Sequence, residues 1–158
     1  MSEHPLIEFG RSLPGVVVDT VGEGSGAPEV AWGDSFFYYD PGDDPGDRRH
    51  PFATIVTKDY TGFDEVSDLD RAGVFRLNVA VGRAAFTGLL GYAPAEQPEH
   101  ADEFDYTQPD VVLPHPIYAA QGWVSIVTPG EQTLETALRL LAAARDLAEQ
   151  RHHRRAQR

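Results

Sequence analysis

Two histidines, His50 and His115, are the residues of this chain best suited to proton transfer or metal binding, because an imidazole titrates near neutral pH. Each is followed directly by a proline, and aspartates fill the neighbouring loops. Brought together with loop carboxylates, they could form a metal- or His-dependent enzyme site. The competing interpretation is that each histidine holds its own turn by hydrogen-bonding the backbone. We favour the second interpretation, because both residues occur in His-Pro turns.

The sequence lacks the motifs that define a known chemistry. It contains no P-loop, no G-x-G-x-x-G, no G-x-S-x-G and no H-E-x-x-H. It also contains no cysteine, which excludes disulfides, thiolate catalysis and cysteine-based zinc sites. The aspartate-rich segment 40–47 lacks the ligand spacing of a calcium-binding loop. We therefore lean towards a non-catalytic protein and assign no catalytic residue, no metal ligand and no cofactor.

A second candidate site is the polar face of a strand expected at residues 74–81. Strict alternation puts its bulky apolar side chains on one face and Arg76 and Asn78 on the other. If the strand that begins at Trp123 lies beside it, Trp123 and Ser125 share this polar face. With Thr54 at the rim, the candidate ligand-binding residues are Arg76, Asn78, His115, Tyr118, Gln121, Trp123, Ser125, Trp32 and Tyr38.

A concave patch of aromatic residues with a few convergent polar groups is the usual form of a small-ligand pocket. An arginine in such a patch suits a carboxylate or a phosphate. The alternative is that Arg76 pairs with one of the many loop carboxylates and the aromatic residues simply pack. The acidic excess of the chain favours this alternative for Arg76. The overall prediction is a small-molecule- or protein-binding domain that uses the sheet face and the adjacent loops.

Hydrophobic periodicity and turn residues predict the elements that position these side chains. Strands are expected at 16–21, 30–32, 35–39, 52–57, 74–81 and 123–127, helices at 4–13, 83–90 and about 129–152, and a short helical turn near 106–113. Thr128 and Glu131 form a T-x-x-E capping box, which predicts that the last helix begins at Pro129. The expected fold class is α+β, an antiparallel sheet of about five to six strands with helices packed on one face. Residues 1–150 are expected to form a single domain and residues 151–158 a basic C-terminal tail.

The distribution of charge argues against a nucleic-acid partner. The chain has 25 acidic and 13 basic residues, and four of its arginines lie in the last eight positions. Residues 1–150 therefore hold nine basic against 25 acidic residues, a net charge of −16. Such a body repels phosphate backbones. No apolar run reaches the roughly 20 residues that span a bilayer, so we expect a cytoplasmic monomer or homodimer whose partner is a small molecule or a protein.

Five segments carry a family resemblance: GVVV, APEVAWGDSFFYYDP, HPFATIVTKDY, SDLDRAGVFRLNVAVGRAAF and LPHPIYAAQGWVSIVTPG. Together they resemble an uncharacterised actinobacterial family that carries a domain of unknown function, and this resemblance implies no activity or catalytic residue. The second half is more distantly similar to the MmcQ/YjbR-like proteins. That similarity implies an antiparallel sheet covered by helices. It also implies DNA binding, a role given to that group by analogy, which the net charge of this chain disfavours.

Overall fold

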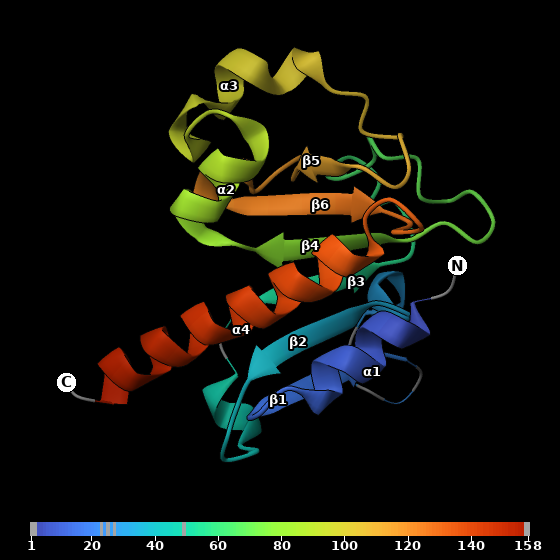
Figure 1. Ribbon diagram of the computed structural model, residues 1–158. Helices are drawn as coiled ribbons and strands as arrows, with labels where there is room; N and C mark the ends of the chain where they lie inside the picture. The colour runs from blue at the N-terminus through green and yellow to red at the C-terminus, as the bar shows by residue number, and fades with distance from the viewer. Residues whose placement is uncertain (1–2, 23, 25, 27, 49, 157–158) are drawn as a thin grey trace.

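The computed structural model describes residues 3–22, 24, 26, 28–48 and 50–156. These residues build a six-stranded sheet in the order β1-β2-β3-β4-β6-β5, with each strand antiparallel to its neighbours (Figure 1). The strands are β1 (Val16–Thr20), β2 (Ser35–Tyr39), β3 (Ala53–Val56), β4 (Arg76–Ala80), β5 (Val112–Pro114) and β6 (Trp123–Val127). The predicted α+β class and antiparallel sheet are confirmed.

The described helices are α1 (His4–Ser12), α2 (Gly82–Leu90), α3 (Gln97–His100) and α4 (Leu134–Ala156). Helices α1, α2 and α4 pack on one face of this sheet and share its core. The long α4 crosses the sheet with α1 beside it (Figure 1). Its buried residues recur at the spacing of one helix face, and they join a core that also contains residues of α1 and α2: Ala137, Leu140, Leu141, Ala144, Leu6, Ile7 and Phe86. None of the described helices is long and apolar enough to cross a membrane.

The alternation predicted for the central strand is confirmed. Phe75 and Leu77 are buried in the core beneath the helices, whereas Arg76 and Asn78 face the opposite side of the sheet. β6 pairs with β4 so that Asn78 lies opposite Ser125. The same register puts Trp123 opposite Ala80, so Trp123, Ser125, Arg76 and Asn78 share one face, as predicted. We call this side, away from the helices, the open face.

Two predicted elements are wrong. Residues 30–32 are not a strand, because Glu29–Ala31 form a short 3-10 turn inside the connection between β1 and β2. The amide of Gly33 donates to the carbonyl of Val21 at 2.8 Å, and β1 pairs directly with β2. The helix expected near 106–113 does not form, and the end of this segment belongs instead to β5, which adds the last strand to the sheet beside β6. In both places the long-range pairing of strands outweighs a weak local preference.

The start of α4 also differs from the prediction. Thr128 has a left-handed backbone (φ 41°) and donates its amide to the carbonyl of Phe75, so the expected capping box does not form and the helix begins at Leu134. The carboxylate of Asp110 caps this segment instead. It accepts hydrogen bonds from the amides of Gly130, Gln132 and Thr133 at 2.8–2.9 Å and from the Thr133 hydroxyl at 2.6 Å. At the other end, residues 151–156 of the expected tail continue α4.

Asp110 should contribute to the pH dependence of stability. The hydrogen bond from the Thr133 hydroxyl, followed by those from the three amides, lowers the pKa of its carboxyl to about 2. The unfolded chain binds this proton near pH 4, so the stabilisation is complete above about pH 4 and is lost as the pH falls towards 2. Asp110→Ala should therefore lower the melting temperature at neutral pH, and its difference from the wild type should shrink on acidification.

Asp110→Asn is the matched control, because asparagine keeps one acceptor and tolerates the left-handed backbone at this position (φ 58°). Its melting temperature should lie between those of the wild type and the alanine variant. Melting curves followed by circular dichroism across the acidic range measure all three proteins. Equal melting temperatures for Asp110→Ala and wild type at neutral pH would contradict the capping role.

Candidate ligand-binding cavity

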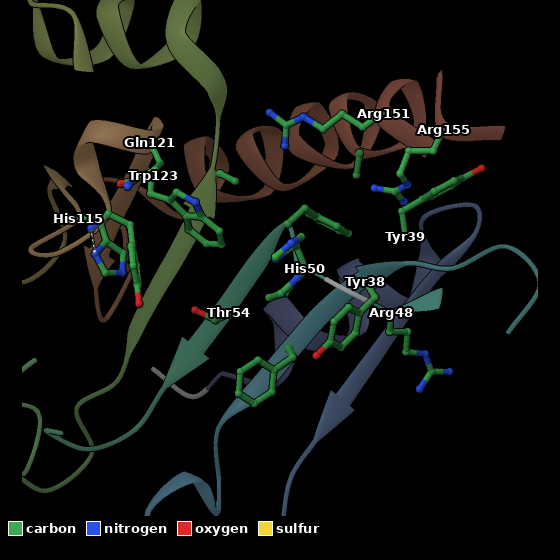
Figure 2. A pocket seen from close by; sticks show the side chains of 16 residues that line it. Tyr38, Tyr39, Arg48, His50, Thr54, His115, Gln121, Trp123, Arg151 and Arg155 are labelled. Atoms are coloured by element: carbon green, nitrogen blue, oxygen red, sulfur yellow. Dashed lines mark hydrogen bonds between the residues drawn. The ribbon is translucent and has the colours of Figure 1, made fainter. Parts of the chain in front are cut away.

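A cavity of about 700 Å³ opens where β2, β3, β4 and β6 meet the C-terminal end of α4. Its volume lies within the roughly 300–1,000 Å³ range of small-molecule sites. Figure 2 shows His115, Gln121 and Trp123 at one end of it and Tyr39 and Arg155 at the other, with the guanidinium of Arg151 between them. The residues that line it are Phe36, Tyr38, Tyr39, Arg48, His50, Pro51, Phe52, Thr54, Ala80, His115, Tyr118, Gln121, Trp123, Ala148, Arg151 and Arg155.

The connection between β5 and β6 forms the first wall. After Pro114 the chain turns through Ala119–Gln121, reverses at Gly122, whose left-handed backbone (φ 86°) permits the turn, and enters β6 at Trp123. The rings of His115 and Tyr118 lie 5.0 Å apart, and that of Trp123 is 6.1 Å from His115 and 6.5 Å from Tyr118. This aromatic cluster gives the cavity a broad apolar surface with several polar edges.

His115 is held in one protonation state by its turn. The backbone amides of Ile117 and Tyr118 both donate to Nδ1 at 3.0 Å, so Nδ1 is an acceptor and the ring proton sits on Nε2. This confirms that His115 holds its turn by hydrogen-bonding backbone. Within the described residues Nε2 has no protein partner, yet every fully buried side-chain nitrogen or oxygen there has one. Nε2 therefore keeps some exposure, and because His115 lines the cavity this atom can donate to a ligand there.

We expect His115 to stay neutral at physiological pH. Burial, followed by the positive charge of Arg76, lowers its pKa to about 3, although Asp64 acts in the opposite direction. The unfolded chain takes up this proton near pH 6.5, so His115 should make the protein less stable as the pH falls from about 6.5 towards 3. In a side-chain NMR titration the chemical shifts of the His115 ring should not change between about pH 8 and 5, whereas those of a His-Pro peptide should change around pH 6.5.

His115→Asn provides the control for that stability effect, because an amide oxygen can accept from the same two backbone amides without titrating. The free energy of unfolding in urea should fall less steeply with acidification in this variant than in the wild type. A His115 titration midpoint near that of the peptide would contradict the assignment.

The opposite wall of the cavity comes from β2 and β3. Phe36 and Tyr38 alternate along β2 on the open face, and Thr54 lies beside Phe36 on β3. Burial, and then the nearby carboxylate of Asp19, raises the pKa of the Tyr38 hydroxyl, which is thus a hydrogen-bond donor at neutral pH. This wall offers aromatic surface and two hydroxyl groups.

The third wall is the last part of α4. Ala148, Arg151 and Arg155 recur every three or four residues and so share one side of the helix, which borders the cavity. Neither arginine has a hydrogen bond or an ion pair with a described residue. Arg48 differs, because it donates to Asp40 at 2.7 Å and to Asp43 at 2.6 Å, and Figure 2 shows its guanidinium turned away from the centre of the cavity.

Arg76 does not line the cavity. Its side chain is 1% exposed and is held by the carboxylate of Asp64 through two hydrogen bonds of 3.0 and 2.5 Å. It also donates to Ser67 at 3.0 Å and to Asn78 at 2.8 Å. The segment between β3 and β4 thus covers this part of the open face, and the alternative in which Arg76 pairs with a loop carboxylate is the one that the structure shows.

Asn78 connects this buried pair to the cavity wall. It accepts a hydrogen bond from the Ser125 hydroxyl at 2.7 Å and donates to the Thr54 hydroxyl at 2.9 Å. Asn78 and Ser125 are each 1% exposed, so they position the wall and do not form its surface. Thr54 is the member of the network that borders the cavity.

Five of the nine candidate residues are brought together around the cavity: Tyr38, His115, Tyr118, Gln121 and Trp123. Arg76, Asn78 and Ser125 are buried, and Trp32 falls in the β1–β2 connection, so these four lie outside the cavity lining. Their part in binding stays a prediction. Among the described residues no group of three or more histidine, cysteine or acidic side chains is arranged to hold a metal ion.

The sequence analysis missed Arg151 and Arg155, because it assigned the terminal arginines to a solvated tail. Their signal was the spacing from Ala148, which places all three on one helix face if the helix continues beyond residue 150. It also missed Arg48 and Tyr39, and nothing in their local sequence marks them as neighbours of a cavity.

The fold and cavity define a class, an α+β protein with a helix-covered sheet and an aromatic cavity of small-molecule size. The chain belongs to DUF6194, a family of unknown function, which matches residues 1–157. The expected membership of a family that carries a domain of unknown function is therefore confirmed. No curated protein and no solved structure matches the chain.

Proposed function

We propose that this protein is a small-molecule-binding protein that uses the cavity between β2, β3, β6 and the end of α4. The observation that carries the proposal is the composition of the lining, in which aromatic rings surround a few polar groups with free hydrogen-bonding capacity. Trp123 and Tyr38 supply apolar surface, while Nε2 of His115 is an open donor. Such sites combine apolar burial for affinity with a few polar contacts for orientation.

Binding without catalysis is the favoured form of this proposal. A general base at neutral pH needs an accessible lone pair and a pKa near 7. The Nδ1 lone pair of His115 already accepts two backbone hydrogen bonds, and burial lowers the pKa of the ring to about 3. His115 is therefore suited to orient a ligand by donating a proton in a hydrogen bond.

The similarity of the second half of the chain to the MmcQ/YjbR-like proteins stays a proposal, and it would suggest a nucleic-acid partner. The charge of the chain supports a small ligand over a nucleic acid. A net charge of −12 opposes the approach of a phosphate backbone, which gains its affinity from many simultaneous cationic contacts. A small molecule that enters one cavity experiences mainly the charges that line it.

The test is a thermal-shift screen of a metabolite library against the full chain, followed by calorimetry on the hits. A ligand that binds the native state raises the melting temperature by mass action. Gln121→Trp should fill the mouth of the cavity and abolish the shift. Gln132→Trp is the matched control, because Gln132 is also exposed but lies outside the cavity lining.

Compounds that raise the melting temperature of the wild type and of Gln132→Trp alike, but not that of Gln121→Trp, would support the proposal. Compounds that raise the melting temperature of all three proteins equally, or a library in which no compound raises it, would contradict the proposal.

A further inference from the structure

The charge of the cavity lining is opposite to that of the rest of the chain. The sequence has 25 acidic residues and a net charge of −12, yet no aspartate or glutamate is among the residues that line the cavity. Its charged and titratable groups, tyrosine hydroxyls aside, are three arginines and two histidines. A site for a cation would carry carboxylates, whereas this lining concentrates positive potential in one concave place.

Two of the three arginines that line the cavity, Arg151 and Arg155, have no carboxylate partner among the described residues. Arg145, six residues before Arg151 in α4, pairs with Asp146 and Glu149 at 2.8 and 2.7 Å. Arg151 and Arg155 have no such partner among the described residues, although acidic side chains are abundant elsewhere. Like charges four residues apart on a helix repel each other. An anion placed between the two guanidinium groups would relieve that repulsion.

The spacing of the two arginines fits one phosphate group. Four residues correspond to about 6 Å along a helix axis, and flexible side chains can converge from that separation on a single anion. Each guanidinium can donate two parallel hydrogen bonds to phosphate oxygens. Two uncompensated positive charges match a dianion better than a monoanion. The helix C-terminus already favours cations, so the experiment below must separate this effect from ligand binding.

The other end of the cavity suits a ring. Trp123 and Tyr118, whose rings lie 6.5 Å apart, provide aromatic surface against which a flat group can pack. Around that surface, His115 can donate a hydrogen bond through Nε2 and Gln121 can both donate and accept. Figure 2 shows this polar and aromatic end set apart from Arg155 and Tyr39, with the side chains of His50 and Arg151 between the two ends.

We propose that the ligand of this cavity is an aromatic or heteroaromatic compound that carries a phosphate dianion, with the ring beside Trp123 and the phosphate on Arg151 and Arg155. This inference rests on the proposed small-molecule function and names its ligand class. The probes are three pairs that differ in the phosphate alone: adenosine monophosphate and adenosine, uridine monophosphate and uridine, phenyl phosphate and phenol. Inorganic phosphate tests the contribution of the anion without a ring. Benzoate tests an aromatic ring that carries a single negative charge.

Affinities are measured by calorimetry and by the fluorescence of Trp123 in a Trp32→Phe background, which leaves one tryptophan. At least one phosphorylated probe should bind about 10-fold or more tightly than its phosphate-free partner, and more tightly than inorganic phosphate or benzoate, because charge-assisted hydrogen bonds are strong. Arg151→Ala/Arg155→Ala should lower the affinity for that probe by about 10-fold or more and leave the affinity for its phosphate-free partner unchanged.

The matched control is Arg139→Ala/Arg154→Ala, which removes the same charge from α4 at two arginines outside the cavity lining. Circular dichroism verifies that both double variants are folded. Retained affinity in the control, together with loss in Arg151→Ala/Arg155→Ala, supports the proposal. An equal loss in both double variants would show a general effect of charge and overturn it.

Three further outcomes also overturn the ligand class. The first is that the phosphate group raises the affinity in none of the three pairs. The other two are that benzoate, or inorganic phosphate, binds as tightly as the best phosphorylated probe. If an uncharged library compound then binds in a manner that Gln121→Trp blocks, the proposed small-molecule function stands and the phosphate inference alone fails. If no compound binds at all, both fail.

Discussion

Asp64→Ala should lower the free energy of unfolding by about 3–5 kcal/mol, because it leaves a buried guanidinium without its counter-charge. The side chain of Arg76 is 1% exposed, and that of Asp64 is 9% exposed. After the substitution, Arg76 keeps hydrogen bonds to neutral partners, Ser67 and Asn78, but has no carboxylate. The measurement is urea denaturation at neutral pH, followed by circular dichroism.

Glu65→Ala is the control for this experiment, because it removes the neighbouring carboxylate of the same loop from an exposed position. Its cost should stay within about 0.5 kcal/mol, as for most surface changes. The double variant Asp64→Ala/Arg76→Met should recover much of the loss, since it removes the unpaired charge as well. An Asp64→Ala cost as small as that of Glu65→Ala would show that the ion pair does not hold the loop on the open face.

Gly10→Ala should destabilise the protein by about 1–3 kcal/mol, the usual cost of overpacking a core. A methyl group at this position of α1 would lie 2.7 Å from Cδ2 of Phe37, and closer still to Cε2. Phe37 is fully buried in the core, where close packing opposes its displacement. Helix propensity alone predicts the opposite sign, a gain of up to about 1 kcal/mol over glycine.

Gly88→Ala in α2 separates these two effects. A methyl group there meets no atom within 4 Å, so this variant should show the gain from helix propensity. Phe37→Leu shortens the side chain that Gly10→Ala would strike, so the double variant should cost less than the sum of the two single changes. Additive costs, or a stabilising Gly10→Ala, would contradict the close contact between α1 and Phe37. Urea denaturation measures all four variants.

The sequence by itself determined the features that depend on local periodicity. The two-residue alternation around Leu77 decided which face of β4 packs against the apolar core beneath the helices, because successive side chains in a strand point to opposite sides. The same rule placed Trp123 and Ser125 on the face of Arg76 and Asn78 once their strands were taken as neighbours. Five of the nine candidate site residues followed from this reasoning, since they belong to that face or to the loop that leads onto it.

The tertiary structure alone decided the features that join distant segments. Asp110 lies 20 or more residues before the amides that it caps, so a capping pattern read at Thr128 could not reveal it. Asp64 was one of many acidic residues available to Arg76, and the path of the β3–β4 loop selected it. Arg151 and Arg155 became part of a cavity because α4 extends to Ala156, and its last turns lie beside the residues of β2, β3 and β6 that line the cavity. Periodicity specifies a face of one element, whereas a site depends on which faces the fold brings together.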